Sequence, residues 1–415
     1  MKDEGEIMKP SIRFNGFRDE WVEKKLGEIL KEGGSGGTPS SSKSEYYDGE
    51  IPFLSISDLS KSDVYVNETL KSITELGLNN SSAWVVPKNA ISLAMYASVG
   101  KVGILSKPMA TSQAFYNMVF DSIETGMFVY QWLMNRYIMN GWRKDISTGT
   151  QPNLNAQIVK STVIQLPTPP EQQKIGALFS KYDTIIALRE QKLAELNTLK
   201  KGMLQKLFVD GVATSHKPQV RFSGFEDEWV EKKLGEIASF SKGNGYTKND
   251  LIESGDPIVL YGRLYTKYET VIEKVDTFVN KKDNSIISEG SEVIVPASGE
   301  TSKDISRASA IGISGLILGG DLNVIKPVIY IDSIFLALTI SNGSQQREMS
   351  KRAQGKSIVH LHNTDLKQVN LLYPKLDEQQ KIGQLFKHLD ARISNEQNKI
   401  KQLKTQKQGL LQRVL

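Results

Sequence analysis

Two long stretches of the chain place apolar residues in steps of three and four, from about Glu171 to Phe208 and from about Glu378 to Leu415. This spacing is typical of the seam of a coiled coil. The seam residues are Ile175, Leu178, Tyr182, Ile186, Leu193, Leu196, Met203 and Leu207 in the first stretch, and Ile382, Leu385, Leu389, Ile393, Ile400, Leu403, Leu410 and Val414 in the second. Each pattern predicts a helix of about 38 residues, roughly 57 Å long.

A single helix of this kind would leave its apolar stripe in water, whereas two such helices in one chain can bury each other's stripe. Polar residues interrupt the seams at matching places, Arg189 and Lys200 in the first and Glu396 and Lys407 in the second. Residues 168–171, Thr-Pro-Pro-Glu, predict a capping box with proline at the first helical position. The alternative is two unrelated helices, each packed on its own domain.

A second repeated segment precedes each helix. Residues 13–29 read RFNGFRDEWVEKKLGEI and residues 221–237 read RFSGFEDEWVEKKLGEI, which match at fifteen of seventeen positions. The helices repeat too, since Glu-Gln-Gln-Lys-Ile-Gly opens both 171–176 and 378–383. A period of about 200 residues is too long for a solenoid. The sequence therefore predicts a tandem duplication of a domain-plus-helix unit.

Between the matched ends, segments 30–167 and 238–374 have similar lengths and different sequences. Strands are predicted at 51–56, 84–86, 90–95, 102–105, 162–166, 257–261, 292–295 and 323–326, and helices near 128–139 and 333–340. Loops are predicted at 33–39, 147–153, 241–248, 261–268 and 347–357, and a polar linker at 209–220. Short strands with few helices indicate α+β domains. Two dissimilar domains on two similar scaffolds suit a protein with one shape and two specificities.

The composition describes an ordinary globular protein of two or three domains, with 415 residues, 39% hydrophobic and 24% charged. There is no cysteine, which excludes disulfides, cysteine metal sites and a thiol nucleophile. The first twelve residues lack the apolar core of a secretory signal, and no apolar run approaches the roughly 20 residues of a membrane span. We therefore expect a cytoplasmic protein with no membrane segment.

The net charge of +5 is unevenly distributed. The two predicted helices carry +3 and +5, so the remaining residues sum to −3. The globular parts are not basic overall, and any contact with nucleic acid must use local patches.

Motifs for catalysis are missing. Residues 355–357, Gly-Lys-Ser, would end a phosphate-binding loop only if position 350 were glycine, but it is Ser350. His360 and His362 stand two apart without cysteine nearby, which favours a plain polar role over a metal site. We find no Asn-Pro-Pro-aromatic motif, carboxylate cluster or nucleophile elbow. We expect no catalytic residue, no metal and no cofactor in this chain.

Several loops instead mix basic and amide side chains with aromatic residues and glycine. Arginine, lysine, glutamine and asparagine can read base edges, and glycine lets backbone amides approach phosphates. The candidate DNA-binding residues of the first half are Lys43, Tyr46, Ser98, Lys101, Gln113, Lys144, Thr150, Gln151 and Asn153. Those of the second half are Lys242, Asn244, Tyr246, Thr247, Lys248, Tyr261, Arg263, Tyr265, Ser298, Thr301, Lys303, Arg347, Lys351, Arg352, Gln354 and Lys356. The alternative is solvated loops with structural tyrosines.

Taken together, these features resemble the specificity subunit of type I restriction–modification enzymes, and the resemblance covers nearly the whole chain. The features are the duplicated Phe-x-Gly-Phe-x-x-Glu-Trp entry at 14–21 and 222–229 and the duplicated Pro-x-x-x-Glu-Gln-x-Lys-Ile opening of each helix. Shorter matches lie at 37–54, 245–262 and 296–301. The second helix departs from the first at its cap, where Lys375 replaces Thr168.

The resemblance implies two globular target recognition domains, each reading half of a bipartite site in double-stranded DNA. It implies that the repeated helices pair antiparallel as a spacer with pseudo-twofold symmetry and dock two methyltransferase (modification) subunits, to which restriction subunits can be added. S-adenosylmethionine, Mg²⁺ and ATP would belong to these partners. The implied divisions are recognition domains at 1–167 and 211–374 and spacer helices at 168–210 and 375–415.

Two other functions compete with this one. A self-contained DNA methyltransferase or nuclease would methylate or cut DNA as the purified chain. A coiled-coil assembly scaffold without DNA contact would tolerate alanine at the basic loop residues.

Overall fold

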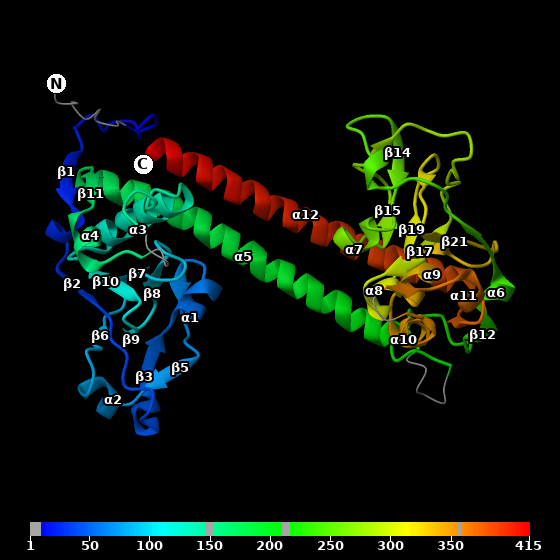
Figure 1. The fold of residues 1–415 in the computed structure, drawn as a ribbon, viewed down its shortest axis with the longest axis horizontal. Coiled ribbons are helices and arrows are strands. Elements are labelled where there is room, and N and C mark those ends of the chain that lie inside the picture. The colour runs from blue at the N-terminus through cyan, green and yellow to red at the C-terminus, as the bar shows by residue number, and fades with distance from the viewer. Residues whose placement is uncertain (1–9, 147–152, 210–215, 356–357) are drawn as a thin grey trace. The chain divides into compact units, whose positions relative to one another are not determined.

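The computed structural model describes residues 10–146, 153–209, 216–355 and 358–415. Thr150, Gln151 and Lys356, three of the predicted DNA-binding residues, lie outside the described part. The chain divides into two compact units (Figure 1). Unit 1 contains residues 1–190 and 399–415, and unit 2 contains residues 191–398. Each unit therefore combines a head, the beginning of one long helix and the end of the other.

The long helices are α5 (Pro169–Leu207) and α12 (Leu376–Val414). Both predicted helices are confirmed to within two residues at each end. All predicted seam residues are buried or half-buried, as expected for an apolar stripe that a partner element covers. Among the described residues, none of the helices combines the length and the apolar character needed to cross a membrane.

Within unit 1, Lys407 of α12 donates to Asp183 of α5 at 2.5 Å, and Lys404 pairs with Glu190 at 2.6 Å. Residue numbers rise along one helix as they fall along the other, so these helix ends run antiparallel.

Unit 2 repeats this arrangement. Lys200 of α5 donates to Asp390 of α12, and Lys192 pairs with Glu396 at 3.0 Å. Lys200 and Lys407 are 207 residues apart, as are Asp183 and Asp390. Two of the four polar interruptions, Lys200 and Lys407, thus form the same ion pair in the two units.

Head 1 (residues 10–167) is an α+β domain. Its strands are β1 (Val22–Lys25), β2 (Glu32–Ser35), β3 (Tyr47–Leu54), β4 (Tyr65–Val66), β5 (Lys71–Ile73), β6 (Val85–Val86), β7 (Ile91–Ala94), β8 (Val102–Leu105), β9 (Met109–Thr111), β10 (Phe115–Val119) and β11 (Val163–Leu166). Its helices are α1 (Ile56–Lys61), α2 (Glu75–Asn79), α3 (Ile123–Ile138) and α4 (Ala156–Ser161). The sheets have the orders β2-β10-β7-β8-β4, β5-β3-β9-β6 and β1-β11.

Head 2 (residues 216–374) is also α+β. Its strands are β12 (Val230–Lys233), β13 (Ala238–Lys242), β14 (Asp256–Val259), β15 (Val271–Ile272), β16 (Phe278–Val279), β17 (Val293–Pro296), β18 (Ser298–Gly299), β19 (Ser309–Ile311), β20 (Ile317–Leu318), β21 (Leu322–Pro327), β22 (Val359–His360) and β23 (Asn370–Tyr373). Its helices are α6 (Leu234–Ile237), α7 (Arg263–Thr266), α8 (Ser302–Ile305), α9 (Ser333–Ile340), α10 (Gly343–Arg352) and α11 (Asn363–Leu366). The sheets have the orders β13-β21-β17-β19-β15, β16-β14-β20, β12-β23 and β18-β22.

The two heads share one strand plan. In both five-stranded sheets, the first strand in sequence pairs with the last, and the edge strands β4 and β15 run parallel to β8 and β19. The smaller sheets agree as well, because β3 runs parallel to β9 and β14 runs parallel to β20. Segments with different sequences therefore form equivalent domains, and the predicted duplication extends through the heads.

The repeated sequences form the joint between each head and its long helix. Arg13 donates to Glu171 at 2.6 and 2.9 Å, and Arg221 donates to Glu378 at the same two distances. These hydrogen bonds raise the pKa of both guanidinium groups. Trp21 adds a donor to Glu171 at 3.2 Å. Glu171 thus serves the joint, a role that the predicted capping box did not include.

Several local predictions were wrong. The predicted loop at 261–268 contains the short helix α7. Residues 33–35 belong to strand β2 and not to a loop. The glycine that suggested a loop is needed in the strand, because a Cβ on Gly33 would lie 2.7 Å from the hydroxyl of Tyr116 on the paired strand. The predicted loop at 347–357 begins inside helix α10, whose Met349 is fully buried. The predicted strand at 51–56 ends at Leu54, and α1 begins at Ile56. Tertiary packing overrides local preference at these places.

Candidate nucleic-acid interface

Four loops of head 1 meet at the ends of the five-stranded sheet. The amide of Gly36 donates to Phe115 at 3.1 Å, and the amide of Met95 donates to Ala114 at 2.7 Å. The carbonyl of Met95 accepts from Leu154 at 2.9 Å. We call the loops 36–38, 95–100, 112–114 and 153–154 loop cluster 1.

Head 2 joins its loops by equivalent bonds. The amide of Gly243 donates to Leu322 at 2.9 Å, and the amide of Ala297 donates to Asp321 at 2.8 Å. The carbonyl of Ala297 accepts from Leu361 at 3.0 Å. We call the loops 243–248, 297–303, 319–321, 354–355 and 358–362 loop cluster 2. Backbone bonds thus fix two similar frames that display different side chains.

Loop cluster 1 gathers three of the predicted residues, namely Ser98, Gln113 and Asn153. Ser98 and Gln113 are exposed and Asn153 is half-buried. Lys144 is exposed and lies two residues after Trp142. The ring of Trp142 packs against Gly100 of loop cluster 1 and leaves no room for a side chain there. These positions are compatible with contact to a ligand outside the protein.

Other candidates of head 1 are engaged inside the protein. Lys101 donates to the carbonyl of Ser60 at 3.1 Å, and burial lowers its pKa. Tyr46 is 5% exposed and accepts from Lys43 at 3.0 Å. This tyrosine is therefore structural, and the side chain of Lys43 is exposed.

Loop cluster 2 and its margins gather most candidates of the second half. Exposed side chains are Lys242, Thr247, Lys248, Thr301, Lys303 and Gln354, and Asn244 is half-buried. Ser298 is buried, and its carbonyl accepts from Tyr265 at 2.5 Å, with Tyr261 against the Tyr265 ring. The two tyrosines support the loop from within.

Two candidates of head 2 are structural. Arg263 is 9% exposed and donates to Glu269 and Asp276, each at 2.7 Å. Hydrogen bonds from Lys267 and then from Arg263 hold the pKa of Asp276 down at about 2. Tyr246 is 7% exposed and its hydroxyl bonds to Ser285 at 2.5 Å. A buried arginine with two carboxylate partners is not available to DNA.

The remaining basic candidates lie on α10. Arg347 and Lys351 are exposed, whereas Arg352 is half-buried and donates to Glu348 at 2.8 Å. A helix that carries lysine and arginine beside the loops can contact phosphates, which needs no base-specific geometry.

The sequence analysis missed two exposed histidines of loop cluster 2. His360 and His362 flank the buried Leu361, and their rings are parallel with centroids 6.3 Å apart. The strand is anchored on both sides, because His360 exchanges two backbone bonds with Gln354 and Asn323 donates to the carbonyl of Leu361 at 2.8 Å. The signal in the sequence is the spacing of two residues between the histidines, which by itself favours a plain polar role.

Tyr96 of loop cluster 1 was missed as well. Its side chain is 44% exposed, and the next residues, Ala97 and Ser98, have φ of 35° and 54°. Two consecutive non-glycine residues in the left-handed region are strained, and such strain is concentrated at functional loops. Nothing in the local sequence indicates it, because neither residue is glycine or asparagine.

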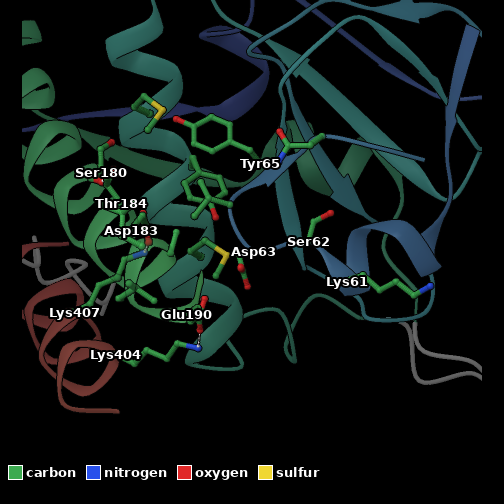
Figure 2. Close-up of a pocket in the computed structure, with 18 of the residues that line it drawn as sticks. Lys61, Ser62, Asp63, Tyr65, Ser180, Asp183, Thr184, Glu190, Lys404 and Lys407 are labelled. Carbon is green, nitrogen blue, oxygen red and sulfur yellow. Dashed lines mark hydrogen bonds and ion pairs between the residues drawn. The ribbon is translucent and has the colours of Figure 1, made fainter. Parts of the chain in front are cut away.

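Unit 1 also has a pocket of about 1070 Å³ away from loop cluster 1 (Figure 2). Its walls come from residues 58–70, from α3, from α5 and from α12. In the described parts of the chain, no group of three or more histidine, aspartate or glutamate side chains could hold a metal ion.

The comparison with known families decides the identity. The family described as type I restriction modification DNA specificity domain matches residues 18–198 and again residues 226–405. This chain belongs to that family.

Two relatives and one solved structure match along almost their whole length. The specificity subunit of the type I restriction enzyme MjaIX from Methanocaldococcus jannaschii is 26% identical over 95% of this chain and 93% of its own. The MjaVIII specificity subunit of the same organism is 24% identical over 97% and 94%. The type I S subunit from M. genitalium superimposes with a TM-score of 0.65 at 15% identity, covering 98% of this chain and 99% of its own.

In a type I DNA specificity protein, two similar backbone frames with different side chains correspond to two recognition domains. The two family matches coincide with the two repeats seen in the sequence. The prediction of a DNA specificity subunit with two recognition domains is confirmed, and a self-contained methyltransferase or nuclease is not favoured. The individual DNA-binding residues stay predictions.

Proposed function

We propose that this chain reads a bipartite DNA site, with loop cluster 1 on one half-site and loop cluster 2 on the other. The observation that carries the proposal is the pair of heads with one strand plan and unrelated loop sequences. Shared backbone frames present each set of side chains in the same way to a groove. Different side chains then select different bases.

We further propose that the chemistry belongs to partner subunits. Both relatives are named as specificity subunits of restriction enzymes, so the names imply assembly with other subunits. Two modification subunits would hold S-adenosylmethionine and methylate adenines, and added restriction subunits would use Mg²⁺ and ATP. The paired ends of α5 and α12 are the proposed docking elements, because both units repeat them.

The alternative function is a coiled-coil scaffold without DNA contact, which the family match does not favour. Binding of the complex to a random DNA library, followed by sequencing of the bound fraction, separates the two. We expect enrichment of two short motifs of three to five base pairs at a fixed spacing, in line with about 3–4 reading side chains per module. A scaffold would enrich no motif.

Lysines at the loop clusters are expected to hold phosphates. Replacing Lys242 and Lys303 with alanine should weaken DNA binding about equally on all sequences. It should also reduce the slope of log binding constant against log salt concentration by about one for each lysine replaced. Titration of the complex with DNA at several salt concentrations measures both effects. Unchanged binding and slope would place these lysines outside the interface. Lys326, which pairs with Glu289 at the end of β21 away from loop cluster 2, is the control position.

The two histidines are expected to read bases. Their separation of 6.3 Å is close to two base-pair steps of about 3.4 Å. Replacing His360 or His362 with alanine should therefore relax one position of one half-site by about 1–3 kcal/mol. Library selection with each variant shows the relaxed position.

The matched control for this test is His388→Ala, because His388 is exposed on α12. That variant should keep the complete motif. Glutamine at 360 or 362 retains one donor and should restore part of the selectivity. A uniform loss of binding, with selectivity intact, would assign the histidines to phosphates instead.

The long helices are proposed to set the gap between the half-sites. Seven residues can be deleted between Asp183 and Lys200 and seven between Asp390 and Lys407, which preserves both ion pairs. A heptad is about 10.5 Å of helix, so the gap should shorten by at most about three base pairs. Methylome sequencing should show a shorter gap between unchanged half-sites. A changed half-site with an unchanged gap would refute the ruler.

A further inference from the structure

The two units differ at one equivalent place, where the edge strand of the head passes the long helices. In unit 2, Thr270 donates to Asp390 of α12 at 2.8 Å, and Glu273 pairs with Lys387 of α12 at 2.5 Å. These two bonds tie the segment around β15 to the helix. We call them the clasp.

Unit 1 has the same backbone and lacks the clasp. The amide of Ile104 donates to Val64 at 2.9 Å, as the amide of Ala310 donates to Thr270 at 2.9 Å, so Val64 is the counterpart of Thr270. Valine has no donor for Asp183. Three positions further along, Asn67 replaces Glu273.

The helix side of the clasp has changed too. At the offset of 207, Ser180 stands where Lys387 stands, so neither charge of that pair is present in unit 1. Val64, Asn67, Ser180 and Asp183 all line the pocket of Figure 2. The pocket therefore lies at the place in unit 1 that is equivalent to the clasp of unit 2.

Apolar side chains form a large part of the pocket walls. Leu70 is 70% exposed, Leu188 is 61% exposed and Tyr65 is 44% exposed. Met127 and Met134 add thioether side chains, which adapt to varied partners. A volume of about 1070 Å³ is at the upper end of ligand pockets. It can hold several side chains of a protein segment.

The charge of the walls selects the occupant. Five acidic and three basic side chains line the pocket. Lys404 and Lys407 are already paired with Glu190 and Asp183. Asp63, Glu68 and Lys61 are exposed and form no ion pair with any described residue, so the lining keeps a net negative charge. Negative charge of this kind repels DNA phosphates and attracts lysine or arginine.

We propose that this pocket receives an apolar segment flanked by lysine or arginine from one modification subunit, and that unit 2 offers no counterpart. The inference rests on the proposed function, because it names a partner of the proposed complex. It makes the two docked subunits unequal: one is held by the repeated helix surfaces and the pocket, the other by the helix surfaces alone.

Two variants test the proposal in the complex with modification subunits. Leu70→Asp with Leu188→Asp adds charge to the pocket walls at exposed positions, so folding is spared. Asn67→Glu with Ser180→Lys installs the counterpart of the Glu273–Lys387 ion pair of the clasp. Ile123→Asp is the matched control, since Ile123 is 62% exposed in the same unit and outside the pocket.

Mass photometry over a dilution series counts the bound subunits. We expect the wild type and Ile123→Asp to hold two copies, and both pocket variants to lose one copy at about tenfold higher concentration. Unchanged binding of both copies, or equal loss of both, would overturn the proposal. The proposal would also be overturned if the wild-type chain dimerised without partner subunits and the Leu70→Asp, Leu188→Asp variant did not. A second copy of the chain would then be the occupant of the pocket. Wild type that binds no modification subunit would instead contradict the proposed function.

Discussion

Replacing Arg221 with alanine is expected to destabilise unit 2 by about 3–5 kcal/mol. Its partner Glu378 is 1% exposed and accepts both guanidinium donors. Without arginine, the buried carboxylate loses two hydrogen-bond donors and its counter-ion. Hydrogen exchange followed by mass spectrometry should show faster exchange through head 2 and little change in head 1, because each unit has its own core.

The matched control is Lys375→Ala. Lys375 pairs with Asp227 at 2.7 Å in the same unit, with side chains 79% and 69% exposed, and exposed pairs contribute about 0–1 kcal/mol. Replacing Arg221 and Glu378 together by methionine and leucine should recover much of the loss, since no buried charge then remains. Equal effects of the Arg221 and Lys375 variants would show that the joint does not stabilise the unit.

Leu411→Asp is expected to unfold head 1, although more than 240 residues separate position 411 from the end of that head. Leu411 is 1% exposed and belongs to the same core as Phe128 and Phe179. Burying a carboxylate there costs several kcal/mol, comparable to the total stability of a domain. Hydrogen exchange should rise through head 1 and stay low in head 2.

The functional readout of this variant is equally specific. A complex with Leu411→Asp should lose selectivity at one half-site and keep it at the other. Gln406→Asp, on an exposed position of the same helix, should leave both half-sites intact. If Leu411→Asp spared head 1, the end of α12 would not be part of unit 1 in solution.

The sequence predicts the long helices well because their information is local and repeated. A period of three and four residues persists over 38 positions, and the second copy confirms the first. Even the polar interruptions had a reason that only the structure gives. Lys200 and Lys407 each meet an aspartate of the other helix.

The heads were harder to predict because their strands are short. β4, β15, β18 and β22 have two residues each, too few to show a period of two. Their common strand order comes from pairings distant in sequence, which no local pattern records. The same limit explains why Arg263 was predicted to contact DNA. It resembles a surface residue in sequence, but in the fold it is buried and paired with Glu269 and Asp276.

The most direct test of two separate readers is the methylome of cells that produce this chain with its modification partner. The account predicts one motif with two specified parts and an unspecified gap. Exchanging residues 30–167 for the equivalent segment of a relative should change one part and leave the other part and the gap unchanged. A contiguous motif without a gap, or a change in both parts after that exchange, would contradict the account.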